Sequence, residues 1–101
     1  MTVGHVISTA RTRVGLTQKD LARRILKEDG QPISPPYLND IERDRRNAPS
    51  VRLLAQFAAA LDLSAEYLYF LAGVYPPDIT PGAATPEGVE AAWQAFRAAL
   101  T

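Results

Sequence analysis

A pattern of one apolar residue, one hydroxyl residue and a leucine four positions after the hydroxyl occurs three times in this chain. The three copies are Leu16-Thr17 with Leu21, Ile33-Ser34 with Leu38, and Leu63-Ser64 with Leu68. At the start of a helix, such a hydroxyl accepts hydrogen bonds from the free backbone amides of the first turn, while the flanking apolar side chains pack together. The pattern therefore predicts three helices and the residue at which each begins.

The first two of these helix starts lie in the stretch from Leu16 to Asn47. A helix from about Gln18 to Lys27 would direct four apolar side chains inward, which are Leu21, Ala22, Ile25 and Leu26. Residues 28–32 then form a polar connector. The next helix carries prolines at its first two positions, where a missing amide costs little, so Ser34 can cap it only through the amide of Tyr37. Two short helices joined in this way indicate a helix-turn-helix.

Helical spacing of apolar residues continues on both sides of this stretch. Residues 3–14 carry one apolar stripe and end at Gly15, which accepts the left-handed conformation that follows a last helical turn. Pro49-Ser50 opens a helix whose apolar residues predict a central place in the core. The helix after Ser64 directs Tyr67, Leu68 and Leu71 inward and ends before Gly73. The alternation typical of half-buried strands is absent, so we expect an all-α fold.

The composition changes from Tyr75 onwards. Residues 75–84 are rich in proline and predict an extended linker. Thr85 then caps a last helix with Pro86 at its first position, and one apolar stripe follows this helix: Val89, Trp93, Phe96 and Leu100. A helix of about fifteen residues is marginal alone in water, so we expect the stripe to be buried. It could fold back on its own domain or cross to a second copy, and the sequence leaves both open.

The residue content excludes several classes of function. There is no cysteine, and the single histidine, His5, has no partner with which to form a zinc site. There is no glycine-rich phosphate loop and no pair of carboxylates on an apolar face, so we expect no enzyme, no metal and no cofactor. No apolar run approaches the roughly 20 residues that span a bilayer. We therefore expect a soluble, cytoplasmic protein.

The net charge of zero hides an asymmetry between the two parts of the chain. Residues 1–52 hold ten basic and six acidic residues, or +4, whereas residues 53–101 hold one basic and five acidic residues, or −4. A polyanion would bind the first part rather than the second. An ordinary solvated surface explains the same charges equally well.

Three segments together resemble a known family: LTQKDLA, SPPYLNDIER and RRNAPSVRLLAQFAAALDLSAEYLYFLAG. They are similar to the Cro/C1-type helix-turn-helix of the xenobiotic-response-element regulators, and the resemblance covers about residues 3–73. It implies a five-helix, lambda-repressor-like DNA-binding domain, here with an appended C-terminal helix. In that family the third helix lies in the major groove while the second crosses the DNA backbone. The domain would comprise residues 1–74, followed by the linker at 75–84 and the amphipathic helix at 85–101.

The resemblance also implies roles for individual residues. Gln18 matches a glutamine that touches phosphate, and Arg11 and Glu42 match a pair that often forms a structural salt bridge. The positions at or beside the base-reading sites are Pro35, Pro36, Asn39, Asp40 and Arg43. The phosphate-binding candidates are Gln18, Lys19, Arg23, Arg43, Arg45 and Arg46.

The chain departs from the family pattern in two places. The connector between the second and third helices is longer by several residues, and Pro35-Pro36 replaces a glutamine or serine that could donate to bases. Direct readout would then depend on Asn39 at adenine, Asp40 at cytosine or Arg43 at guanine, with proline able to contact a thymine methyl.

These observations predict a transcriptional regulator, most simply a repressor, that binds double-stranded DNA as a homodimer on a palindromic operator. The stripe on the last helix supplies the dimerisation candidates. Two alternatives stay open on the same fold. One is an antitoxin that represses its own operon and masks a toxin with its C-terminal segment, and the other is a protein-interaction adaptor that does not bind DNA.

Overall fold

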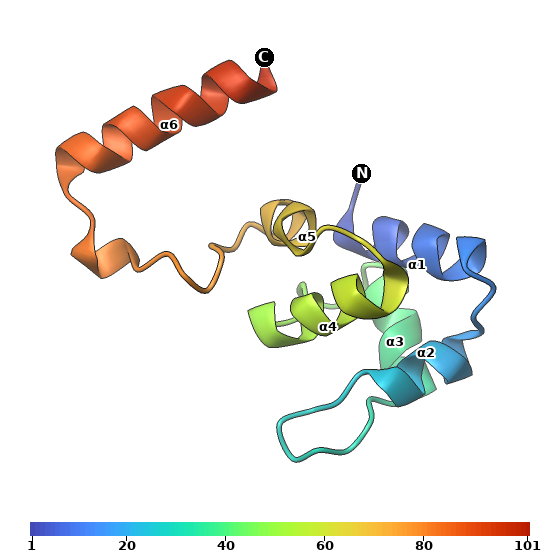
Figure 1. Cartoon of the computed structure of the whole chain (residues 1–101). Coiled ribbons are helices and arrows are strands. Elements are labelled where there is room, and N and C mark those ends of the chain that lie inside the picture. The colour runs from blue at the N-terminus through green and yellow to red at the C-terminus, as the bar shows by residue number, and fades with distance from the viewer.

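The computed structural model describes all of residues 1–101 and contains six α-helices and one 3-10 turn. The elements are α1 (Val3–Arg13), α2 (Gln18–Arg24), α3 (Pro35–Glu42), α4 (Val51–Leu61), α5 (Ala65–Ala72), η1 (Pro81–Ala83) and α6 (Pro86–Leu100). Helices α1 to α5 form one bundle, and α6 stands apart from it at the end of an extended segment (Figure 1). The all-α fold expected from the sequence is confirmed.

Every α-helix of the protein begins at a hydroxyl side chain that accepts a hydrogen bond from a first-turn amide. The six N-caps are Thr2, Thr17, Ser34, Ser50, Ser64 and Thr85. Ser34 is bonded by the amide of Tyr37, as Pro35 and Pro36 require. Thr17 and Asp20 form a reciprocal capping box, in which each side chain accepts from the other residue's amide. All three helix starts predicted from the repeated pattern are confirmed.

Helix α4 lies at the centre of the core. Its Leu54, Phe57 and Leu61 are fully buried, and it packs against α1, α2 and α5. Burying side chains of this size contributes roughly 1.5–3 kcal/mol each. Helix α4 therefore holds α1, α2 and α5 together, and α3 packs in turn against α1 and α2.

The prediction for the end of the second helix was wrong. Helix α2 ends at Arg24, and Ile25 is already extended, with φ −108° and ψ 115°. Leu26 forms an isolated antiparallel bridge with Pro32 and is 40% exposed instead of packing inward. The chain leaves the helix early because residues 25–34 fold into a short hairpin, which we call the α2–α3 hairpin.

Helix α5 also differs from its expected orientation at one residue. Leu68 is fully buried and Leu71 packs partly against the core, but Tyr67 is 43% exposed, whereas Tyr69 is buried. The helix turns this way because its inner face meets both α4 and α1. The left-handed Gly73, with φ 71°, ends it as predicted.

The apolar stripe of α6 is left largely exposed by its own domain, which is only one of the two partners expected to bury it. Val89, Trp93, Phe96 and Leu100 are between 38% and 61% exposed. The helix approaches the bundle at one aromatic contact, where the rings of Phe96 and Phe70 of α5 have centroids 5.7 Å apart. Trp93 packs edge-on against Phe96 at 5.5 Å. None of the six helices combines the length and the apolar character needed to cross a membrane.

Candidate nucleic-acid interface

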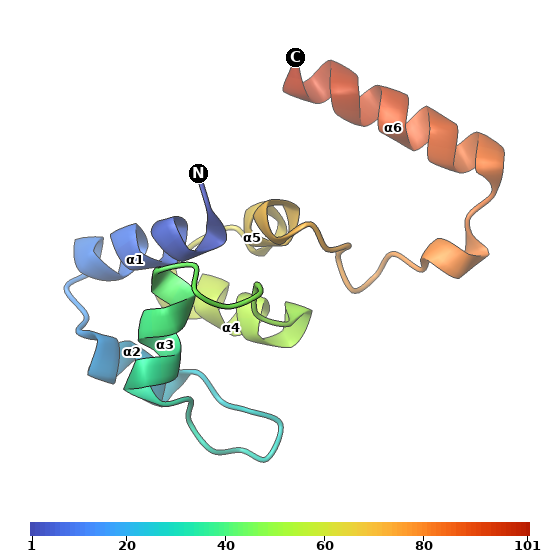
Figure 2. The ribbon, with the colours of Figure 1, turned by 180° about the vertical axis from the view of Figure 1, so that it is seen from behind.

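Helix α3 lies on the open face of the bundle. Figure 2 shows it in front of α2 and α4, with no helix covering its outer side. Its inner side is fixed by Leu38 and Ile41, which are buried among side chains of the core. Pro35, Pro36 and Arg43 are exposed, and Asn39 and Asp40 are half-buried. The structure therefore brings all five base-reading candidates to one short helix and the residue that ends it.

A buried ion pair joins α3 to α1. The Nε of Arg11 donates to Oε2 of Glu42 at 2.7 Å, and its Nη2 donates to Oε1 at 2.9 Å. The side chain of Glu42 is only 4% exposed. The hydrogen bond from Arg11 to Glu42 raises the pKa of Arg11 above its usual value, partly opposed by burial and assisted by the charge of Glu42. Arg11 also donates to the carbonyl of Leu16, so this one side chain ties α1, the α1–α2 turn and α3 together.

Gln18 of α2 extends this ion pair towards the exposed face of α3. Its Nε2 donates to Oε1 of Glu42 at 3.0 Å and to Oδ1 of Asn39 at 3.2 Å. The same Oδ1 accepts from Nε of Arg43 at 3.2 Å. Both hydrogens of the Gln18 amide are used within the protein, so Gln18 links α2 to α3. A phosphate contact, the role expected for this side chain, would require one of these hydrogen bonds to be released.

Arg46 is held against α3 instead of pointing freely into solvent. Its Nε lies 3.3 Å from Oδ2 of Asp40, and its guanidinium lies 5.0 Å from the centre of the Tyr37 ring. An exposed pair of this kind contributes at most about 1 kcal/mol, so DNA could displace it. Asp40 in turn has one oxygen occupied by Arg46, which lowers its capacity to accept from a cytosine.

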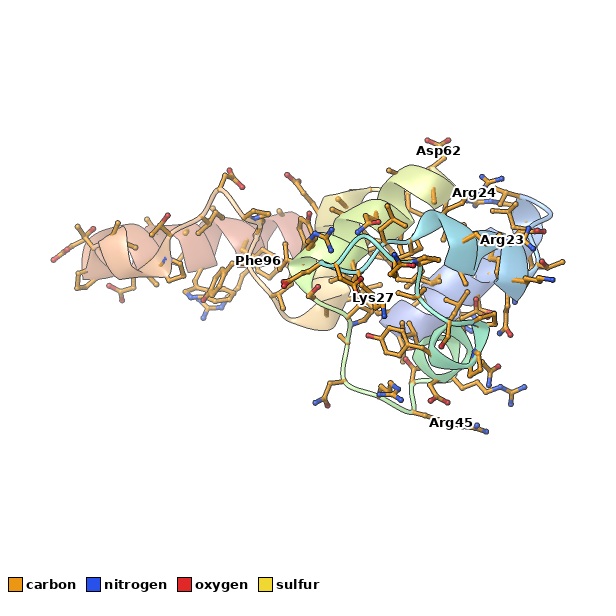
Figure 3. The ribbon with its side chains drawn as sticks, turned by 90° about the horizontal axis from the view of Figure 1, so that it is seen from below. Arg23, Arg24, Lys27, Arg45, Asp62 and Phe96 are labelled. Carbon is orange, nitrogen blue, oxygen red and sulfur yellow. The ribbon has the colours of Figure 1, made fainter.

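The other cationic candidates are unpaired and lie on both sides of α3. Lys19 and Arg23 are exposed on α2, and Arg45 is exposed in the turn after α3; none of them forms an ion pair. Figure 3 shows Arg23 on one side of α3 and Arg45 on the other. Arg24 is also exposed beside Arg23 and was not among the predicted phosphate-binding residues. Unpaired cations on both sides of α3 match the two phosphate backbones that border a groove of duplex DNA.

The α2–α3 hairpin is anchored to α4 by two side chains that the sequence did not identify as important. Gln56 accepts from the amide of Leu26 at 2.7 Å and donates to its carbonyl at 2.8 Å. Arg52 donates to the carbonyls of Leu26 and Lys27 at 3.0 and 3.3 Å. The hairpin reverses at Gly30, with φ 84°. Because Gln56 and Arg52 bind backbone atoms of a distant segment, the sequence indicated only that both side chains lie on the polar side of a helix.

The turn after α3 anchors the start of α1. Asp44 adopts a left-handed conformation with φ 56°, and its carboxylate accepts from the hydroxyl of Thr2 at 2.6 Å and from the amide of Gly4 at 3.2 Å. The end of the candidate reading helix therefore caps the first helix. No group of three His, Cys, Asp or Glu side chains in the chain is placed to hold a metal ion.

Comparisons with known proteins agree with this geometry. A family model described as helix-turn-helix matches residues 7–68. Proteins from two strains of Mycobacterium tuberculosis, both named as uncharacterized HTH-type transcriptional regulators, are 38% identical over 77 residues, which cover 76% of this chain and 50% of each relative. The chain therefore spans about half the length of these curated relatives.

Solved structures of SinR share the fold of the bundle. The N-terminal DNA-binding domain of SinR from Bacillus subtilis is 30% identical, with a TM-score of 0.54 over 65% of this chain and 87% of that one. SinR, the master regulator for biofilm formation, in complex with DNA gives 30% identity and a TM-score of 0.55 over 66% and 97%. A SinR–SinI complex covers 99% of this chain and 84% of its own at 23% identity, with a TM-score of 0.55, and shows similarity of fold alone.

Proposed function

This chain belongs to the Cro/C1-type helix-turn-helix family of transcriptional regulators, and from that premise we propose that it binds specific DNA sequences through α3. The observation that carries the proposal is the uncovered polar face of α3 with unpaired cations on both sides of it. Phosphate contacts set the position of such a domain on DNA, while base contacts discriminate between sequences. Both kinds of contact are available on this one face.

In the proposed complex α3 lies in the major groove and α2 crosses the backbone, the docking geometry of this class. Lys19 and Arg23 of α2 contact one phosphate strand, and Arg45 contacts the other. Arg46 also contacts a phosphate once its ion pair with Asp40 is broken. Asn39 and Arg43 point towards base edges, and Pro35 and Pro36 offer apolar contact to thymine methyl groups.

We propose that the DNA-bound form is a homodimer on a palindromic operator. A single small module buries only about 600–1,000 Å² on DNA, so two copies on half-sites one helical turn apart would add both affinity and discrimination. The exposed stripe of α6 supports this assignment, because four large apolar side chains on one helix face are unfavourable in water. In this organisation residues 1–74 bind DNA, residues 75–84 connect, and residues 85–101 dimerise.

Repression is the simplest regulatory outcome for this arrangement. A dimer seated in the groove excludes other proteins from the same DNA without any further contact. A second candidate follows from the same α6 stripe, which would equally fit a different protein chain. The chain would then be an antitoxin that represses its own operon and covers a toxin with residues 85–101.

Titration of the full chain against duplexes selected from genomic DNA tests the proposal. Each phosphate contact contributes about −0.9 to the slope of log K against log salt, so about three to four contacts per copy give a slope near −3 for a monomer and near −6 for a dimer. Lys19→Ala should reduce the magnitude of the slope by about 1 per copy. Arg13→Ala on α1 is the matched control, because Arg13 is exposed and has no proposed DNA or dimer contact, and it should leave the slope unchanged. A complex insensitive to salt, or no complex at low salt, would overturn DNA binding.

A further inference from the structure

The orientation of the Asn39 amide is set by a chain of hydrogen bonds that begins at Arg11. A guanidinium can only donate, and a carboxylate can only accept. Arg11 donates to both oxygens of Glu42, so Gln18 must present its NH2 group to Glu42 Oε1, which lies 3.0 Å from Nε2. The same NH2 group reaches Asn39 at 3.2 Å, so Asn39 must present its oxygen.

Reversing either amide would create contacts between groups of like polarity. A rotated Gln18 would place its oxygen against the carboxylate of Glu42. A rotated Asn39 would place its NH2 group against the donors of Gln18 and Arg43, at the two positions that are now 3.2 Å from Oδ1. Each amide therefore has one orientation that satisfies its neighbours, and this orientation follows from the chemistry of Arg11, Glu42 and Arg43.

The free group of Asn39 is consequently its NH2. Oδ1 already accepts two hydrogen bonds, one for each lone pair. Nδ2 donates to no group of the protein, and no buried side-chain nitrogen or oxygen lacks a partner, so Nδ2 reaches solvent. Arg43 uses its Nε on Asn39 and keeps both terminal nitrogens, which can also only donate. The two side chains together present donors and no acceptor.

This polarity changes which base the face can read. Asparagine recognises adenine in a bidentate way by donating to N7 and accepting from the N6 amino group. Asn39 cannot accept, so adenine would leave its amino group facing another donor. Guanine presents two acceptors in the major groove, N7 and O6, and thymine presents only one. Guanine therefore matches the donor pair best.

We propose that Asn39 and Arg43 form a donor-only reading pair that selects guanine, and that Gln18 and Glu42 act as positioning residues that set its polarity. The inference rests on the proposed function, since it requires α3 to lie in the major groove. It replaces the expectation that Asn39 reads adenine.

Asn39→Asp is the sharpest test, because it is nearly isosteric and reverses the free group. One oxygen of the aspartate still accepts from Gln18 and Arg43, while the other faces the groove as an acceptor. Sequences bound by the full-length wild type should contain one guanine per half-site whose replacement weakens binding about tenfold. Asn39→Asp should abolish that preference and favour cytosine, whose N4 donates. Asn47→Asp, in the exposed turn after α3, controls for the added negative charge and should keep guanine.

Gln18→Met gives a second readout that a purely structural role would not produce. It removes one of the two donors that fix the Asn39 oxygen, so adenine should become more acceptable at the same position. Thermal melting of each variant shows whether the domain is folded. Asn39→Ala identifies the base pair that Asn39 reads, because the sequence preference at that position should weaken. If the wild type prefers adenine at that position, the donor-only pair is overturned while DNA binding stays intact. The same holds if Asn39→Asp and Asn39→Ala both select the same sites as the wild type. No binding to any duplex at low salt would overturn both the pair and the proposed function.

Discussion

Gly4 of α1 lies so close to Ile41 of α3 that a β-carbon added at Gly4 would stand 2.3 Å from the Ile41 carbonyl oxygen. The same β-carbon would be 2.6 Å from Oδ1 of Asp44 and 2.9 Å from the carbonyl oxygen of Glu42. Two of these three neighbours are backbone atoms of α3 that cannot rotate away. The contact therefore sets how closely the first helix approaches the C-terminal end of the candidate reading helix.

Gly4→Ala should destabilise the protein, although alanine normally favours a helix over glycine by about 1 kcal/mol. The β-carbon would push α1 away from α3, and overpacking of this kind costs roughly 1–3 kcal/mol. Urea denaturation gives the change in the free energy of unfolding. Gly82→Ala is the matched control, because a β-carbon there meets nothing within 4 Å. A stabilised Gly4→Ala variant would contradict the close approach.

Glu42→Gln should be among the most destabilising single changes, because it leaves Arg11 without its ionic partner at a site where the glutamate side chain is only 4% exposed. Breaking a buried pair in this way costs about 3–5 kcal/mol, whereas replacing both partners with apolar residues is often close to neutral. The double variant Arg11→Met with Glu42→Leu should therefore recover much of the loss. A double variant as unstable as the single one, by chemical denaturation, would argue against the ion pair as the cause.

The capping box at the start of α2 should make stability depend on pH in the acid range. Hydrogen bonds from the side chain and then from the backbone of Thr17 lower the pKa of Asp20; burial partly opposes this shift, and the charges of Arg23 and Arg24 add to it. A carboxyl whose pKa is lower in the folded state stabilises that state above its unfolded pKa, and this contribution disappears as pH falls through the folded pKa.

Asp20→Asn removes the titrating group with little change of shape. The wild type should exceed this variant in urea midpoint at pH 7, and the difference should shrink below about pH 4. A difference that stays constant from pH 7 to pH 2 would show that Asp20 acts without its charge.

Deleting residues 85–101 should convert the proposed dimer into a monomer, because the deletion removes the apolar stripe of α6. Trp93→Ala should weaken the dimer by about 2 kcal/mol or more, the effect typical of a buried aromatic at an interface. Gln94→Ala, beside Trp93 on α6, is the matched control. Light scattering after size-exclusion chromatography measures the mass. If the truncated chain remains a dimer, α6 is not the dimerisation element.

The positions of the helix starts followed from local chemistry, so they could be predicted from the sequence. A threonine or serine at an N-cap contacts amides two or three residues away, and Thr17, Ser34 and Ser64 needed no information about the rest of the fold. The same is true of Gly15 and Gly73, whose left-handed conformations end helices. The outer face of α3 was predicted from its polar spacing for the same reason.

Contacts between distant segments were decided only by the tertiary structure. The early end of α2 depends on Gln56 and Arg52, which bind the backbone of the α2–α3 hairpin from another helix. The exposure of the α6 stripe depends on where residues 75–84 carry that helix, and a stripe of apolar residues does not specify what covers it.

The amide of Asn39 shows this division most clearly. The sequence determined that an asparagine would lie on the exposed face of α3, because helical spacing is a local property of the chain. Only the tertiary structure decided which end of the amide points outward, since Arg11, Gln18 and Glu42 come from three helices and meet only in the fold. A hydrogen bond depends on the polarity of both partners, and the partners of Asn39 are assembled by packing.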